Sequence, residues 1–487
     1  MIEVKHDKGL DPFVDDNEDQ IEGTTEQSEA SLGQDTVYLT CHESIQTRHT
    51  VFQALVIADC ARLLRWDRSG AVVTCKIPLS DPDFFEFFWR FCHLGPEERG
   101  WDMMMEKPDR KARTGGGREG TGIEGDVKYY TKISLGKGTY ITHRIFSGTQ
   151  SPFGRGTRGY SAYCLTTNRV VFLKSTWRVV GDGRMPEHEI YDVLHAKNVT
   201  HIPTVVEYAE VKNHVTKTQD APDSWRKKNV KNLRRFQHYI IVFEELCRKF
   251  EKFQSHKQLL TAFTHAAEAH QQAIDDACIL HRDISAGNIL ITREGNGLLG
   301  DWDMAKHLDD IKDGSPQPER TGTFQFLSAR FVSDEYDFGP HDRKDDVESF
   351  FHTLQWIVLR FVHHGMEPVR LGETLYSVFD ATTPGPKGLV RCRGRLVCLQ
   401  NSIWVRCANL TDILRDLLED LGKTINSRYI PANDMDRAKQ HYEKYQTLQK
   451  QLQLDPAQSN PDKIESLGEK RELAKLAILY EDLGSAN

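Results

Sequence analysis

The chain has 487 residues, of which 39% are hydrophobic and 28% are charged, and its formal net charge is −8. This length allows two or three domains with sizeable cores. The acidic balance argues against a protein that coats nucleic acid, and no apolar run approaches the roughly 18 residues of a membrane span.

The N-terminal residues lack the apolar stretch of a secretory signal. Ten cysteines are scattered along the chain without a CxxC pair, a pattern typical of a reduced protein and not of a disulfide framework or a cysteine zinc site. We therefore expect an intracellular protein, cytoplasmic or nuclear, with no membrane partner.

The first third of the chain contains two segments with the composition of disordered chain. Residues 11–36 hold nine acidic residues and no Lys or Arg, so we expect 1–36 to be a disordered acidic tail. Strand-like runs and an apolar helical pattern then predict a small α+β module over 37–106. The Gly-rich stretch 107–127 is expected to be a linker.

The rest of the chain changes from strand patterns to helix patterns. Strand-like runs dominate 128–245, with one helical segment near 186–197, and helical patterns dominate 246–445. This order predicts an α+β, two-lobed fold with its chemistry at the junction. Residues 446–487 are expected to be a linker followed by a short helix.

A basic stretch lies before the last strand of the first lobe. Residues 225–235, "WRKKNVKNLRR", hold six basic residues in eleven positions. We interpret it as a solvated face, with a nuclear-import signal or a patch for an acidic partner as the alternative.

The sequence "LHRDISAGNILI" at 280–291 is the strongest chemical signal. Asp283 and Asn288 lie five residues apart on a predicted turn, and Asp301 follows the next strand-like run. Asn288 and Asp301 offer the hard oxygen ligands that Mg²⁺ prefers. Asp283 would then be the base that accepts a proton from a hydroxyl nucleophile.

These residues resemble the catalytic and metal-binding loops of eukaryotic-type protein kinases. The resemblance implies further parts upstream. Gly154, Gly156 and Gly159 in "FGRGTRGY" have the spacing of a loop that covers phosphates, and Lys174 ends an apolar strand. The segment "PEHEIYDVLHA" offers Glu189 as the ion-pair partner of Lys174, with Glu187 as the alternative.

The resemblance assigns other positions as well. The backbone of Glu244 and Leu246 in "FEELC" would bind adenine. Thr323, in "RTGTFQFLSAR", would help to position Asp283, and Asp346, in "DDVESFF", would brace the catalytic loop.

Several motifs narrow the resemblance to the fungal-type protein kinase family over roughly residues 48–360. They include "RLLRWDRSGA", "FFWRFCHLGPEERGWD", "HRDIS" and "DWD". Membership implies the use of ATP and Mg²⁺ and the phosphorylation of a protein hydroxyl. We expect this hydroxyl to belong to Ser or Thr in preference to Tyr. Ser285 replaces a lysine that Ser/Thr kinases usually carry, Asp303 replaces the glycine of DFG, and Arg330 replaces the glutamate of APE.

Two alternatives remain open from the sequence. A small-molecule phosphotransferase of the aminoglycoside or choline type would suit "DWD". Arg282 and the segment 320–330 favour a protein kinase, because small-molecule kinases generally lack that segment. A pseudokinase that binds nucleotide and partners without turnover is the second alternative.

Overall fold

The computed structural model describes ten stretches of the chain, namely residues 1–45, 48–108, 130–147, 151–181, 184–228, 233–312, 322–333, 339–384, 390–401 and 410–429. They form two compact units. Unit 1 comprises Met1–Ala196 and Pro203–Cys247, and unit 2 comprises Lys197–Ile202 and the chain from Arg248 onward. From the sequence we expected the boundary between the two units at 245/246, and we did not expect residues 197–202 to belong to the second unit. The expected C-terminal segment 446–487 and nearly all of the expected linker 107–127 lie outside the described residues.

Unit 1 begins with a five-stranded sheet. Strands β1 to β4 lie in chain order, with β1 parallel to β2 and the other neighbours antiparallel, and β5 pairs with β3. The bounds are β1 Ile2–Lys5, β2 Val51–Ile57, β3 Cys60–Asp67, β4 Gly70–Val73 and β5 Ile77–Pro78.

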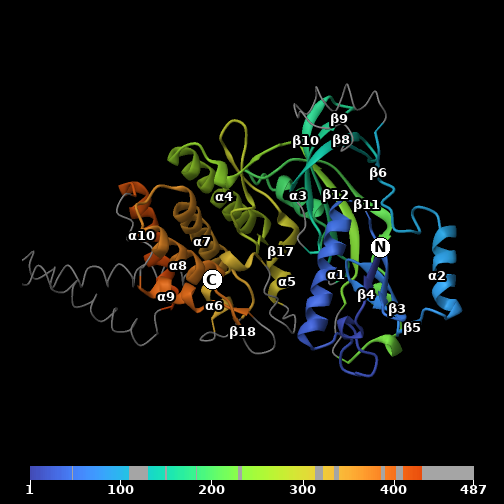
Figure 1. Cartoon of the computed structure of the whole chain (residues 1–487). Coiled ribbons are helices and arrows are strands. Elements are labelled where there is room, and N and C mark those ends of the chain that lie inside the picture. Colours follow the sequence, from blue (N-terminus) through green and yellow to red (C-terminus); the bar gives the residue numbers. More distant parts are fainter. Residues whose placement is uncertain are drawn as a thin grey trace, which may run out of the picture. The chain divides into compact units, whose positions relative to one another are not determined.

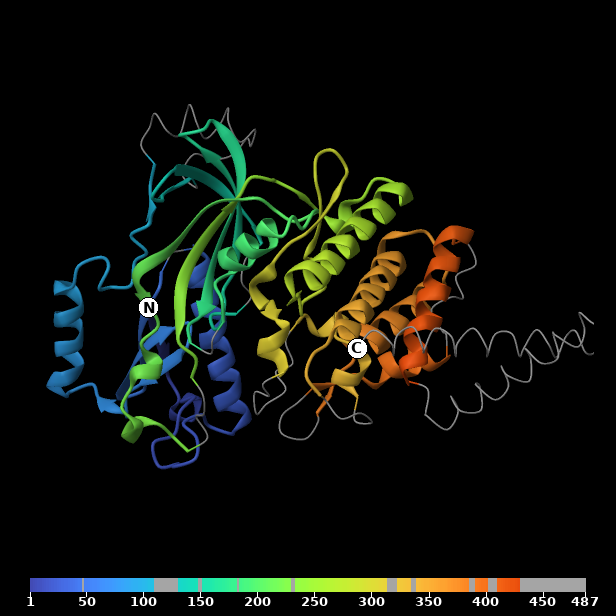
Figure 2. The ribbon, with the colours of Figure 1, turned by 180° about the vertical axis from the view of Figure 1, so that it is seen from behind.

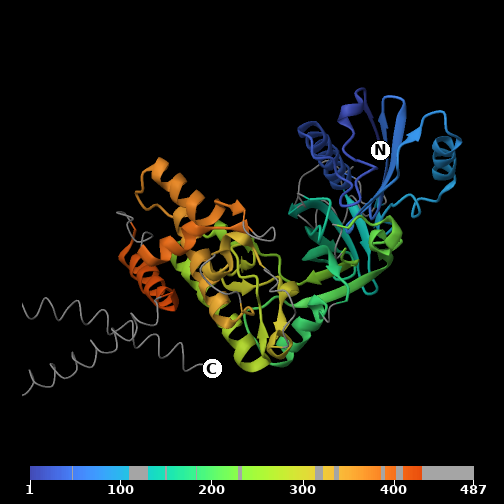
Figure 3. The ribbon, with the colours of Figure 1, turned by 90° about the horizontal axis from the view of Figure 1, so that it is seen from below.

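Helices α1 (Glu26–Ile45) and α2 (Pro82–His93) lie on opposite sides of this sheet (Figure 3). On the α1 side, Leu39 packs into a core with inward residues of β2 and β3. On the other side, Phe52 of β2 meets Phe91 of α2 edge-on at 5.7 Å. Alternate residues of a strand point to opposite faces, which explains how one strand serves both helices.

The expected disorder of residues 1–36 is wrong, because this stretch contains β1 and the first part of α1. Two of its acidic residues pair with a buried arginine. Arg62, which is fully buried, pairs with Asp11 (Nη2 to Oδ2, 2.9 Å) and with Asp15 (Nη1 to Oδ1, 2.7 Å). The composition of the segment could not reveal this cation, because it lies about 50 residues further along the chain.

The second sheet of unit 1 has seven strands, in the order β11-β12-β10-β9-β8-β7-β6 (Figure 1). The bounds are β6 Met105–Glu106, β7 Thr131–Ser134, β8 Thr139–Ser147, β9 Arg158–Cys164, β10 Arg169–Val179, β11 Val205–Val215 and β12 Phe236–Phe243. Helix α3 (Glu187–Ala196) contacts β11. Because β6 comes from the expected module 37–106, that segment continues directly into this sheet.

Unit 2 is mainly helical (Figure 2). Its helices are α4 His256–Ala277, α5 Leu308–Lys312, α6 Ala329–Val332, α7 Arg343–Phe361, α8 Pro368–Leu375, α9 Arg393–Asn401 and α10 Asp412–Asn426. Helix α7 contacts both α4 and α10. A capping box starts α7, in which Asp342 accepts from the N–H of Asp345 while the Asp345 side chain accepts from the N–H of Asp342.

Short strands of unit 2 carry the loops of the candidate site. They are β13 Arg248–Lys249, β14 Ile279–Leu280, β15 Ile289–Ile291, β16 Gly297–Leu299, β17 Lys306–His307, β18 Thr383–Pro384 and β19 Val390–Arg391. Strands β15 and β16 form an antiparallel hairpin against α4. Among the described helices, none combines the length and the apolar character needed to cross a membrane.

Candidate active site

The glycine-rich segment precedes β9 in unit 1. Gly154 and Gly156 have φ angles of +76° and +50°, which L side chains rarely adopt. A Cβ on Gly156 would lie 2.4 Å from Cζ of Arg68, so the guanidinium group packs directly against this turn. Gly159 lies in β9, opposite Lys174 of β10. Of the expected glycines, Gly159 therefore lies beside Lys174, whereas Gly156 packs against Arg68.

Lys174 forms a buried ion pair with the first turn of α3. Its Nζ lies 2.7 Å from Oε2 of Glu187, and the two side chains are 7% and 2% exposed. The expectation that Glu189 is the partner is wrong. Glu189 is two residues further along α3, about 200° around the helix, and is exposed. The alternative weighed from the sequence, Glu187, is the residue in contact.

The segment expected to bind adenine follows β12. Glu244 is exposed, its backbone N–H donates to the carbonyl of Thr204 (3.0 Å), and its side chain pairs with Arg169 at 2.8 Å. Leu246 lies two residues further on, in irregular backbone and partly buried.

Asp283 of unit 2 is held on one carboxylate oxygen by Thr323. Both the backbone N–H and the hydroxyl of Thr323 donate to Oδ1 of Asp283, each at 2.8 Å. The preceding Gly322 permits this approach, since its φ is +116° and a Cβ there would lie 2.9 Å from the carbonyl oxygen of Arg282. The contact expected between Thr323 and Asp283 is present.

Asn288 and Asp301 lie at the same end of the β15–β16 hairpin. The N–H of Gly300 donates to the carbonyl of Asn288 at 2.8 Å, which places the residue after Gly300 beside Asn288 along the chain. The side-chain Nδ2 of Asn288 donates to the carbonyl of Asp283 (2.7 Å). Asn288 therefore directs its Nδ2 to the protein, and its Oδ1 is the atom suited to a metal ion.

Asp346 is buried and anchors the loop that carries Arg282 and Asp283. Its side chain accepts from the backbone N–H of Arg282 (3.0 Å), from His270 (3.0 Å) and from His341 (2.8 Å). Burial alone would raise the pKa of Asp346, but His341 and His270 hold it well below its usual range. Arg282 has a φ of +69°, a strained geometry that the Asp346 contact stabilises. The sequence indicated Asp346 but neither histidine.

The reversed charge at Arg330 has an acidic partner on α7. Its Nε donates to Oδ1 of Asp345 at 2.7 Å, and Arg428 pairs with the same carboxylate at 2.8 Å. Asp345 is fully buried. Burial raises the pKa of Asp345, but the hydrogen bond from Arg330 and the charge of Arg428 outweigh this and lower it to about 2. The substitution at 330 therefore belongs to a complete ion-pair network, which the sequence did not reveal.

The loops of unit 2 and the paired lysine of unit 1 are both features typical of protein kinases. A family model described as "Fungal protein kinase" matches residues 18–358, well over half of the sequence, and the chain belongs to this family.

Shorter stretches are similar to two plant proteins from Arabidopsis thaliana. The L-type lectin-domain containing receptor kinase IX.2 is 38% identical over 83 residues, which cover 17% of this chain and 12% of the relative. The L-type lectin-domain containing receptor kinase V.5 is 34% identical over 98 residues, covering 18% and 14%. The chain thus matches only a small part of each relative.

Proposed function

We propose that this protein transfers the γ-phosphate of ATP, in the presence of Mg²⁺, to a serine or threonine hydroxyl of a protein substrate. The observation that carries the proposal is the fixed carboxylate of Asp283. Thr323 occupies its Oδ1 with two donors, so Oδ2 is the oxygen to which an acceptor hydroxyl would donate. A base fixed in this way supports general-base catalysis, worth about 10²–10⁴-fold in rate.

The residues of unit 2 fit Mg²⁺. Oδ1 of Asn288 and the carboxylate of Asp301 are hard oxygen donors, and one amide with one carboxylate leaves positions for water and phosphate oxygens. Bound Mg²⁺ would neutralise the charge that develops on the phosphates. Asn288 is further fixed by its own hydrogen bond to the Asp283 backbone, which ties metal ligand and base to one turn.

The residues of unit 1 fit the nucleotide. Lys174, held by Glu187, would bind the α- and β-phosphates. The backbone around Gly154 and Gly156 would cover the phosphates. Backbone groups of Glu244 and Leu246 would bind the adenine.

The buried Ser285 gives the proposal a distinct feature. Its carbonyl accepts from the N–H of Asn288 (3.1 Å), so it forms part of the same turn. A serine brings no charge to the transferring phosphate, where other Ser/Thr kinases usually place a lysine. Charge neutralisation therefore rests on Lys174 and on Mg²⁺.

The test is incubation of purified protein with γ-labelled ATP, Mg²⁺ and generic protein acceptors, with Asp283→Ala and Lys174→Ala as controls. Phosphoamino-acid analysis of the labelled acceptor identifies the hydroxyl. We expect label in phosphoserine or phosphothreonine that both substitutions abolish.

Other outcomes identify the alternatives. Label confined to small aminoglycoside or choline acceptors would indicate a small-molecule phosphotransferase. Nucleotide binding without transfer to any acceptor would indicate a pseudokinase and contradict the proposal.

A further inference from the structure

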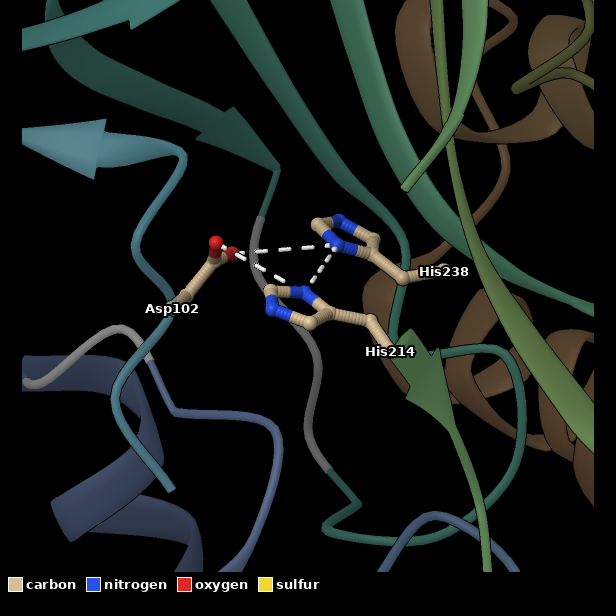
Figure 4. A group of neighbouring side chains, drawn as sticks. All are labelled: Asp102, His214 and His238. Atoms are coloured by element: carbon tan, nitrogen blue, oxygen red, sulfur yellow. Dashed lines mark hydrogen bonds and ion pairs between the residues drawn. The ribbon is translucent and has the colours of Figure 1, made fainter. Parts of the chain in front are cut away.

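Three buried side chains of unit 1 converge at a point that the proposed reaction does not use. Asp102 precedes β6, His214 lies near the end of β11, and His238 lies in β12 (Figure 4). Their exposed fractions are 7%, 2% and 2%. Asp102 is more than 100 positions from either histidine in the sequence, yet the fold places the three candidate ligand atoms together inside the protein.

The spacing of these atoms matches a tetrahedral metal site. The two Nδ1 atoms of His214 and His238 are 3.3 Å apart. Each lies 3.7 Å from a different carboxylate oxygen of Asp102. Two ligands at about 2.0–2.1 Å from a tetrahedral Zn²⁺ are separated by about 3.3–3.4 Å, so only a few tenths of an ångström of adjustment is needed.

Groups around the cluster orient two of its ligands. Nε2 of His238 lies 2.8 Å from Oγ of Ser175, and the backbone N–H of Met104 donates to Oδ1 of Asp102 at 2.9 Å. When Nε2 of His238 carries the proton, Nδ1 carries a lone pair. Metal-binding histidines almost always have such a partner on the opposite ring nitrogen.

The charge of the cluster also favours a cation. A carboxylate as buried as that of Asp102 needs a compensating charge. The protein itself brings Arg158 and at most one protonated ring near this carboxylate, since two protonated rings cannot face each other at 3.3 Å without repulsion. A divalent cation compensates the carboxylate while both rings stay neutral.

We propose that Asp102, His214 and His238 bind one Zn²⁺ ion, through one carboxylate oxygen and two Nδ1 atoms, with water as the fourth ligand. His49, whose ring lies 4.6 Å from that of His214, is not a ligand. Its two nitrogens contact Oγ1 of Thr50 (3.1 Å) and the carbonyl of Glu97 (3.2 Å).

The site would join two parts of unit 1. Asp102 belongs to the chain that leads from the five-stranded sheet into β6, whereas both histidines belong to the seven-stranded sheet. Ser175, which contacts His238, is the residue after Lys174 in β10. The ion would therefore have a structural role. It would fix the chain segment that contains Asp102 to the strands next to the proposed phosphate-binding lysine.

A second cluster in unit 2 provides a matched control. His201, His265 and Glu268 also lie close together, but His265 and His201 stack face to face at 3.9 Å. Nδ1 of His265 already accepts from the N–H of Gly297 (3.1 Å), and the side chain of Glu268 is 48% exposed. These features suit a metal site less well.

The experiment uses the full chain, purified without a polyhistidine tag, in the presence of excess Mg²⁺. Zinc content is measured by mass spectrometry. The ion is then removed with a chelator, and Co²⁺ is titrated back while the visible absorption of tetrahedral Co²⁺ is followed. Asp102→Asn and His214→Gln are compared with His265→Gln, for the second cluster, and with Asp301→Asn, for the proposed Mg²⁺ site.

We expect about one equivalent of zinc, a tetrahedral Co²⁺ spectrum with nitrogen and oxygen ligands, and a melting temperature that rises by about 3 °C or more when Zn²⁺ is restored. Asp102→Asn and His214→Gln should lose the metal, and the two controls should keep it. Absence of zinc and of a tetrahedral Co²⁺ spectrum in the unsubstituted protein would overturn the proposal. So would a thiolate charge-transfer band, or loss of the metal only in the controls. The unsubstituted protein decides the question even where a variant fails to fold.

Discussion

Lys174 and Glu187 form a buried ion pair between β10 and the first turn of α3, with Nζ and Oε2 2.7 Å apart. Removal of one member of such a pair leaves an uncompensated charge in a buried position, which costs about 3–5 kcal/mol. The pair therefore fixes the side chain of Lys174 on β10, at the position where Gly159 of β9 lies opposite it.

The first prediction separates the two glutamates of α3. Glu187→Gln should lower phosphate transfer by about 10²-fold or more, because Lys174 would lose the carboxylate that orients it. Glu189→Gln should stay within about twofold of the unsubstituted protein, since Glu189 is exposed. Initial rates with γ-labelled ATP measure both effects. Equal losses in the two variants would show that the contact in the structure is not the functional one.

The second prediction concerns the support of Asp283. Thr323→Val removes the hydroxyl donor but keeps the backbone N–H that also bonds Oδ1. We expect kcat to fall by about tenfold, with little change in KM for ATP, because the base is less well oriented while nucleotide contacts are intact. Thr323→Ser should retain most of the activity. If Thr323→Ser is as impaired as Thr323→Val, the methyl packing and not the hydroxyl bond is what matters.

These contacts show which features a sequence can predict. Asp283 and Asn288 lie five residues apart on one turn, so their spacing could be used directly. The contact of Thr323 with Asp283, which lies 40 positions away, was expected from the resemblance to protein kinases, and it is present. The choice between Glu187 and Glu189 depended on the rotation of a helix about its axis, which two acidic residues in its first turn do not define.

The remaining differences involve partners that are distant in the sequence. Arg62 binds the acidic segment that composition alone suggested to be disordered, and Asp345 and Arg428 complete the network of Arg330. His214 and His238 lie on separate strands and become neighbours of Asp102 only in the folded sheet. Local patterns carry no information about such pairings.

The third prediction tests the Arg330 network. Arg330→Met should lower the free energy of unfolding by about 3 kcal/mol, because Asp345 is buried and Arg428 compensates it only in part. Arg343→Met is the control on the same helix as Asp345. Its pair with Asp275 is exposed (43% and 44%), so its loss should cost less than about 1 kcal/mol. Urea denaturation followed by circular dichroism compares the two variants.

The fourth prediction follows from the pKa of Asp345, which is lowered from 3.8 to about 2 in the folded protein. A lowered pKa stabilises the fold at pH values above about 4, where the carboxylate is charged in both states, and this contribution is lost as the pH falls from about 4 to 2. The difference in melting temperature between the unsubstituted protein and Arg330→Met should therefore shrink over this interval. A difference that stays constant from about pH 6 to about pH 2 would mean that the charge of Asp345 does not stabilise the network.

The last prediction concerns the turn before β9, where two glycines with similar backbones differ in their surroundings. A methyl group on Gly154 would lie in open space, whereas a methyl group on Gly156 would meet the guanidinium of Arg68. Arg68 cannot easily move, because it forms an ion pair with Glu43 (3.1 Å), donates to the carbonyl of Ser151 (3.1 Å) and has a side chain that is 3% exposed.

Gly154→Ala should therefore cost about 1–2 kcal/mol, the penalty of a left-handed backbone alone. Gly156→Ala should lower the melting temperature further and raise KM for ATP more, since displacement of Arg68 also disturbs the turn proposed to cover the phosphates. Thermal unfolding and ATP saturation curves measure the two effects. Identical melting temperatures for the two variants would show that the Arg68 side chain moves aside at little cost. Arg68, which follows β3, would then not hold this turn in place.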